Sequence, residues 1–253
     1  QSITIGIRRK GDWNVDASLT HGASAFRFDI DNTVNASLGT ASPTTFDAGT
    51  LSSSQTVANL DLLHKLDTDA VKSLALVLGS ELRVENYQIT AGDQASYELG
   101  TATTAGGQPK LPGAQVFPGF QPSNEVDRTR DNIGIYAGLE SELNSAIALD
   151  VGGRFENYSD FGQSVIGKAA ARAKLGGGLS LRAAVNTGFR APSLQQLWFS
   201  NVSSQFLPDA MGNLQPTQVL TSNNESPVTK AFAIPKLHEE KSTNFSTGIA
   251  YRP

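Results

Sequence analysis

Residues 132–190 consist of four consecutive segments in which apolar and polar side chains alternate with a period of two. Segment 146–158 shows this most clearly, because its two faces consist of Ile147, Leu149, Val151 and Phe155, and of Asp150, Arg154 and Glu156. A β-strand points successive side chains to opposite faces, so each segment reads as a strand with one apolar and one charged side. The residues between the segments are few, which predicts an antiparallel up-and-down meander.

Residues 74–87 continue the same alternation, and the five segments together hold thirteen charged side chains, all on the face opposite the apolar one. One face can be chosen freely for each segment, so eight placements are constrained, and chance would give them in roughly one of 256 cases. This period predicts an all-β fold. The charged residues that we expect along the polar face are Glu81, Arg83, Glu85, Glu140, Asp150, Arg154, Glu156, Lys168, Arg172 and Arg182.

The rest of the chain extends the meander to about nine strands. Further strands are expected at residues 2–9, 13–30, 57–66 and 242–251, and long loops at residues 32–56, 90–126 and 192–235. Apart from a short connection near residue 160, short turns alternate with long loops, as at the two rims of an outer-membrane β-barrel. Within residues 13–30 the apolar positions change parity between Leu19 and Phe26, which predicts a β-bulge near Gly22.

Composition narrows the possible functions. The 253 residues carry a net charge of −4, with a pI near 5.4, and this balance gives no sign of a nucleic-acid partner. The absence of Cys is compatible with export, and no run of about 18 apolar residues encodes a transmembrane helix. The three His residues lack metal-site spacing and no nucleophile motif is present, so we expect neither a metal, a cofactor nor an enzyme.

Alternation alone does not decide whether the apolar face packs into a soluble core or contacts lipid. Three features favour lipid. The strands span about eleven to fifteen residues, against five or six in ordinary sheets. Many apolar-face positions are Ala or Gly, which fill a core poorly, and the other face carries charges of both signs, as a wet or plugged lumen would. We therefore predict a partial wall of a large transmembrane β-barrel, with a soluble β-sandwich as a rival.

Five segments stand out: GFRAPSLQQL at residues 188–197, and residues 79–87, 117–120, 154–162 and 239–244. Together they closely resemble sequences typical of TonB-dependent receptors, and their order and spacing look like the family's. The resemblance implies a 22-stranded barrel around an N-terminal plug, which imports scarce nutrients across the outer membrane of a Gram-negative bacterium. Residues 1–253 would form a single region supplying about nine of those strands, and both ends look like cuts through a longer protein.

The resemblance also implies partners. They are outer-membrane lipid, the plug domain of the same full-length chain, TonB through the missing N-terminal region, and a small-molecule or glycan ligand. That ligand would be a siderophore, cobalamin, a metal chelate or an oligosaccharide, bound where the three long loops face the outside. A passive porin without a coupled plug stays the alternative, because charges along a lumen also serve ion selectivity.

Four residues near the expected mouth are candidates for ligand contact: Tyr87, Arg130, Arg190 and Trp198. Two of them, Arg190 and Trp198, have a structural reading beside the functional one. Residues 188–193 fit a strand end, because Pro192 cannot continue a β-ladder, and Trp198 could pack within its own loop as well as stack on a ligand.

Overall fold

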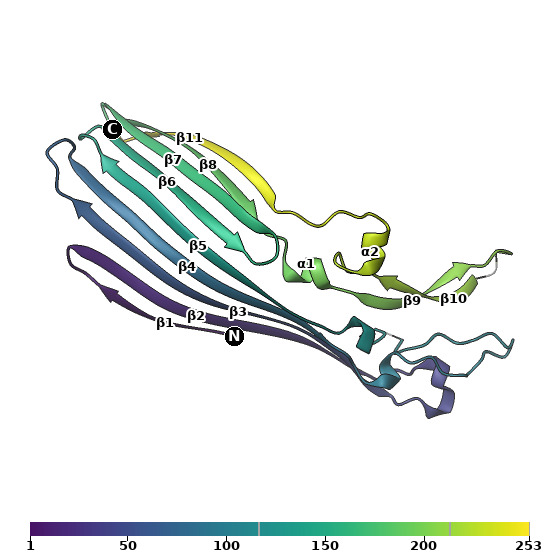
Figure 1. Ribbon diagram of the computed structural model, residues 1–253. Coiled ribbons are helices and arrows are strands. Elements are labelled where there is room, and N and C mark those ends of the chain that lie inside the picture. The colour runs from purple at the N-terminus through teal and green to yellow at the C-terminus, as the bar shows by residue number, and fades with distance from the viewer. Residues whose placement is uncertain (116, 213, 253) are drawn as a thin grey trace.

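The computed structural model describes residues 1–115, 117–212 and 214–252. Nine of the eleven strands in these residues form one antiparallel sheet: β1 (Ser2–Arg9), β2 (Trp13–Asp31), β3 (Thr45–Leu66), β4 (Ser73–Thr90), β5 (Val126–Glu142), β6 (Ile147–Tyr158), β7 (Gly162–Gly176), β8 (Leu179–Arg190) and β11 (Glu240–Tyr251). They are arranged in that order, so the predicted meander is confirmed. The sheet is an open, curved wall with β1 and β11 at its edges, and therefore a partial barrel (Figure 1).

Short turns join the strands at one end of the wall, and the long connections gather at the other end (Figure 1). We call residues 32–44 the first loop, 91–125 the second loop and 191–239 the third loop. The third loop contains α1 (Leu194–Trp198), the hairpin of β9 (Asn201–Pro208) and β10 (Leu214–Thr221), and α2 (Pro227–Ala231). The first two loops contain the short 3-10 helices Ala36–Ala41, Gln94–Ser96 and Pro122–Asn124. No helix in the described residues is long and apolar enough to cross a membrane.

The turns at the short end are specified by individual residues. Asn144 accepts hydrogen bonds on its Oδ1 from the backbone N–H groups of Ala146 at 2.8 Å and Ile147 at 2.9 Å, which closes the turn between β5 and β6. The turn between β7 and β8 is built from Gly176, Gly177 and Gly178, whose φ angles of 87°, 57° and 80° strain any residue with a Cβ.

The first long loop is shorter than the sequence predicts. Residues 45–56 were expected in the loop because Ser and Thr dominate them, yet β3 begins at Thr45. This segment pairs with β2 on one side and with β4 on the other, for example Ser53 with both Ser24 and Tyr87. Hydrogen bonding to two neighbours outweighs the weak strand propensity of these side chains.

The predicted β-bulge near Gly22 is wrong. Gly22 pairs in unbroken register with Gln55, and the register shifts only between Arg27 and Asp29. The extra residue lies in β3, where Gly49 has a φ of 98°, a conformation that glycine adopts readily. The parity change in the sequence is real, but it does not come from a bulge. The strand stays in register, and the apolar side chains of β2 lie on one face of the sheet up to Leu19 and on the opposite face from Phe26.

One face of the sheet is apolar and uncovered along most of its length. Cross-strand pairs such as Leu82 with Ile133 bring apolar side chains together on this face. Leu139, Leu149 and Leu181 are 41%, 39% and 38% exposed, so no second layer seals them as a sandwich would. Most of the chain's large apolar side chains are therefore on the surface of the wall.

The packed core lies at the loop end, on the other face. Tyr87, Ile89, Phe120 and Leu194 are buried together, and Phe28 stacks on Phe117 with ring centroids 4.5 Å apart. The side chains of β4 thus change roles along the strand: apolar residues cover one face up to Val84, and the opposite face from Tyr87 onward.

Candidate functional site

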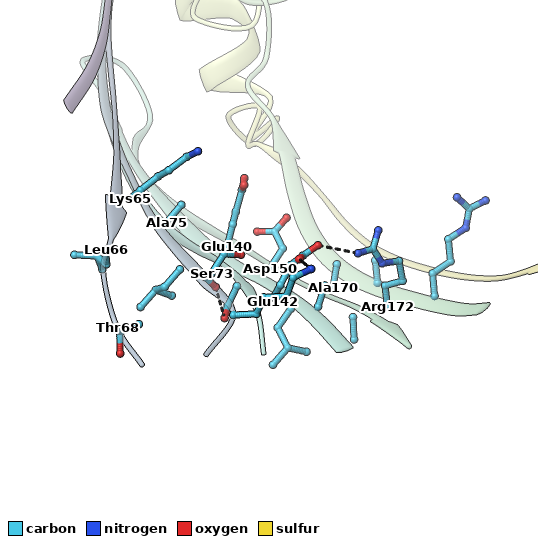
Figure 2. A pocket seen from close by; sticks show the side chains of 18 of the residues that line it. Lys65, Leu66, Thr68, Ser73, Ala75, Glu140, Glu142, Asp150, Ala170 and Arg172 are labelled. Carbon is cyan, nitrogen blue, oxygen red and sulfur yellow. Dashed lines mark hydrogen bonds and ion pairs between the residues drawn. The ribbon is translucent and has the colours of Figure 1, made fainter. Parts of the chain in front are cut away.

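The concave face of the wall carries the charged side chains. Figure 2 shows Lys65, Glu140, Asp150 and Arg172 projecting into the concave side from β3, β5, β6 and β7, whereas Leu66 points away from it. Strand register places the other residues of the predicted polar set on this same face, since Glu81 pairs with Gly134 and Gly134 pairs in turn with Glu156. All ten predicted polar-face residues share this face: Glu81, Arg83, Glu85, Glu140, Asp150, Arg154, Glu156, Lys168, Arg172 and Arg182.

A compact ion network lies midway along this face. Arg154 contacts Glu156 at 2.5 Å through Nε and Glu81 at 3.3 Å through Nη2, and Arg83 contacts Glu81 at 2.5 Å. The guanidinium of Arg154 also lies 5.6 Å from the ring centroid of Tyr136. The network contains two cations and two anions, so its net charge is close to zero. This balance lowers the cost of burying part of it.

The charges near the short turns are more exposed. Lys168 contacts Asp150 at 2.8 Å, and Glu142 is shared between Lys72 at 2.7 Å and Arg172 at 3.4 Å. Such pairs exchange readily with other partners because solvent screens them. An open hollow of about 820 Å³ lies beside them, and Figure 2 shows Glu140, Glu142, Asp150 and Arg172 at its lining. Lys72 and Arg182 line the same hollow.

The four candidate ligand residues do not share one environment. Tyr87 is 4% exposed within the loop-end core, and Arg130 is 3% exposed beneath the third loop. Trp198 is partly buried against that core, and Arg190 is exposed at the end of β8. The structure therefore groups Tyr87 with Trp198, leaves Arg190 apart, and gives Arg130 partners within the chain.

Sequence reasoning missed Arg128, whose guanidinium lies 4.4 Å from the ring centroid of Trp198. Arg128 has the same parity on β5 as Arg130, so strand periodicity alone could have placed it on the inner face. This pair lies at the loop end of the concave face, which we call the mouth. A cation over an indole ring is a surface suited to aromatic or anionic groups.

The first and second loops hold each other through buried hydrogen bonds. The Asn35 side-chain amide is fully buried and donates to the carbonyl groups of Ala95 and Glu98, both at 2.9 Å. The Ala102 backbone N–H donates to the Ser37 carbonyl at 2.9 Å. These two loops therefore form one packed unit beside the mouth.

A separate charge cluster braces the third loop. Glu225 contacts Lys236 at 3.1 Å and Lys230 at 3.3 Å. Burial alone would raise the pKa of Glu225, but the hydrogen bonds from Lys236 and Lys230 outweigh it and lower that pKa below its ordinary value. Across the described chain, no group of three or more His, Cys, Asp or Glu residues could hold a metal ion.

An open wall with an apolar convex side, a charged concave side and long loops at one rim defines part of a large transmembrane-type β-barrel. Residues 2–253 match the family described as TonB dependent receptor-like, beta-barrel, and the chain belongs to this family. The resemblance seen in the sequence motifs is thereby confirmed. Receptors of this family lie in the outer membrane and act in transport, and as a family they interact with a plug and with TonB.

Solved structures of such receptors are similar to the chain. A mutant of the ferric enterobactin receptor PfeA from Pseudomonas aeruginosa superposes with a TM-score of 0.63 at 17% identity, over 100% of this chain and 32% of that one. The siderophore receptor PirA from Acinetobacter baumannii gives 0.59 at 13% identity, again over 100% and 32%. The RagAB peptide transporter gives 0.51 at 12% identity, over 98% and 27%.

These likenesses establish the fold and leave the ligand open. The chain spans about a third of the length of the siderophore receptors that it matches. No protein with a curated description matches it. A siderophore receptor and a peptide transporter share this wall, so the wall by itself does not specify what is carried.

Proposed function

We propose that the full-length protein is an outer-membrane receptor of a Gram-negative bacterium that imports a nutrient by TonB-coupled transport. The observation that carries the proposal is the height of the apolar band. On β4 the band runs from Leu74 to Val84, which at about 3.4 Å per residue and a strand tilt of about 40° spans about 25 Å along a barrel axis. This is the height of the lipid-facing band in outer-membrane barrels.

The residues that follow the band support a membrane boundary at Val84. On the same face, Val84 is followed by Asn86, which pairs with Thr129 and donates hydrogen bonds to Thr129 and to Asp127. Polar side chains that bond each other on a convex surface fit water beyond the lipid. The long loops then stand on the outer side, where a ligand arrives.

The concave face fits a plug domain better than an open pore. Its central charges already neutralise each other, so they offer a nearly neutral, hydrogen-bonding wall to a folded domain. Within the described chain, Glu140 and Arg182 have no ion-pair partner, although both line the hollow near the turns. We propose that the plug supplies partners to these two residues.

For the ligand, we propose a ferric siderophore as the first class to test. The siderophore receptors PfeA and PirA support it, and the Arg128–Trp198 pair at the mouth would suit an anionic, aromatic chelate. Cobalamin, other metal chelates and oligosaccharides are the further classes within the same proposal. Of the sequence candidates, Arg190 and Trp198 are exposed enough to contact such a ligand without rearrangement.

The test uses the full-length receptor in the outer membrane of a host that lacks its own siderophore receptors. Radiolabelled ferric enterobactin should accumulate in cells with TonB and should bind without accumulating in cells that lack it. Uptake of small solutes that is independent of TonB, with swelling of receptor-containing liposomes in sugar solutions, would favour the passive porin. Absence of the receptor from the outer-membrane fraction would refute the proposal altogether.

A further inference from the structure

Arg130 is the most buried charged side chain in the described strands of the wall, with 3% of its surface exposed. Its guanidinium donates to Glu85 Oε2 from Nε at 2.9 Å and from Nη2 at 2.6 Å. The remaining nitrogen, Nη1, donates to the Pro192 carbonyl at 2.6 Å and to Asp160 Oδ2 at 3.4 Å. The same guanidinium lies 5.3 Å from the Tyr158 ring centroid. Every nitrogen of the guanidinium is therefore used within the chain.

These contacts join segments that are distant in the sequence. Glu85 belongs to β4, Asp160 to the turn between β6 and β7, and Pro192 to the start of the third loop. Arg130 and Pro192 are 62 residues apart in the sequence, so this hydrogen bond attaches the start of the third loop to β5. A side chain with a single donor could not bond Glu85, Asp160 and Pro192 at the same time. The guanidinium can, because it has five N–H groups.

The Pro192 carbonyl is a suitable point of attachment. The first backbone hydrogen bond of α1 runs from the Leu197 N–H to the Ser193 carbonyl at 3.1 Å, so the Pro192 carbonyl lies just outside the helix. Ser193 then caps α1 by accepting from the Gln196 N–H at 3.1 Å. Fixing Pro192 therefore fixes where α1 begins and which way it runs.

The position of α1 in turn sets the inner surface of the mouth. Leu194 and Leu197 are 7% and 6% exposed, and they bury the apolar side of α1 against the wall. The last residue of α1 is Trp198, which lies under the Arg128 guanidinium. A shift of α1 would separate this pair and release the segment that follows it.

We propose that Arg130 is a positioning residue that latches the third loop onto the barrel wall and thereby holds the mouth in shape. Its role in ligand capture rests on the proposed function, but the latch itself does not. Replacing Arg130 leaves the Glu85 carboxylate and the Pro192 carbonyl without their donor, so α1 loses its fixed starting point while the strands remain paired.

The experiment measures the loop position directly in the full-length receptor, reconstituted in lipid. Spin labels are placed on cysteines at Leu99 in the second loop and at Val228 in α2, which are 64% and 46% exposed. Pulsed electron–electron double resonance then gives the distribution of distances between the labels. We expect Arg130→Ala to broaden this distribution at least twofold and Arg130→Lys to broaden it less. The matched control is Arg27→Ala, since Arg27 forms ion pairs at the same end but is 59% exposed in its side chain.

A distribution as narrow in Arg130→Ala as in the unsubstituted receptor would overturn the latch. If Arg130→Ala does not fold, Glu85→Gln decides instead, because it keeps the shape of Glu85 and removes the charge that holds Arg130. Broadening in Glu85→Gln supports the latch, and an unchanged width overturns it. Binding of ferric enterobactin is measured on the same samples. Loss of the latch with no binding in any sample would refute the proposed ligand and leave the positioning role intact.

Discussion

Ile135→Arg tests whether the convex face of the wall contacts lipid. Ile135 is 53% exposed and lies near the middle of the apolar band, where it pairs with Ser80 on β4 and with Phe155 on β6. The side chain has no cavity to fill and no polar partner to lose. Its substitution therefore reports the medium around the wall more than the packing within it.

The expected cost depends on that medium. At the midplane of a bilayer, an arginine on the lipid face of a barrel costs about 2–4 kcal/mol, and near the interface about 0–1 kcal/mol. In water the same change on an exposed face stays within about 0.5 kcal/mol. A lipid-facing Ile135 thus predicts a drop of about 30- to 700-fold in the folding equilibrium constant, because each 1.4 kcal/mol is a factor of ten.

The assay refolds the full-length receptor into lipid vesicles across a denaturant series and reads the folded fraction from heat-modifiable migration. The matched control is Thr129→Arg, on the same strand and the same face but beyond the band, where Thr129 is exposed next to Asn86. We expect Thr129→Arg to stay within about 0.5 kcal/mol of the unsubstituted receptor. Equal costs for the two substitutions would refute the lipid assignment of the convex face.

Two further predictions use the same receptor. A Cβ at Gly79 would overlap the ring of Tyr136, so Gly79→Val should lower the free energy of unfolding by about 1–3 kcal/mol, and an unchanged value in the refolding assay would contradict the packing. The pKa of Glu225 is lowered in the folded state. The stability that its charge contributes is therefore complete above about pH 4.5, its ordinary pKa, and is lost as the pH falls through the folded-state pKa. Proteolysis of the third loop should therefore accelerate in acid, with an acid-stable protease, and Glu225→Gln should remove the acceleration that comes from releasing Lys230 and Lys236.

Strand periodicity predicted the wall well because one rule governs most of it. Wherever two faces of a strand meet different media, the side chains must alternate, and segments such as 146–158 record this directly. The order of the strands also follows, since short turns such as Asn144-Ser145 allow only neighbouring antiparallel strands. The rule placed all ten predicted polar side chains on one face of the sheet, as the strand register has them, whereas their role in lining a lumen or contacting a plug stays a prediction.

The loop end could not be read in the same way. The apolar parity of β2 changes without any bulge near Gly22, because beyond this point the inner face of the sheet packs against the loops. Tyr87 and Arg130 were chosen as ligand residues from their position near the loop end, but both contact the start of the third loop, more than sixty residues away in the sequence: Leu194 packs in the core with Tyr87, and the Pro192 carbonyl accepts from Arg130. Contacts of that kind leave no periodic trace.

The exchange of faces itself explains how one strand serves two environments. Up to Val84, β4 places apolar side chains toward the convex side, where lipid would solvate them, and charged ones toward the lumen. From Tyr87 onward the apolar side chains of β4 face the inner side, where α1 and Phe120 pack against them. Under the proposed location, water would replace lipid on the convex side at this height, and apolar side chains there would have no partner. Moving the boundary by one pair of residues would expose either apolar groups to water or polar groups to lipid. Under the proposed outer-membrane location, the parity change would mark where the bilayer ends, and the latch at Arg130 would lie just outside the membrane, where the third loop begins.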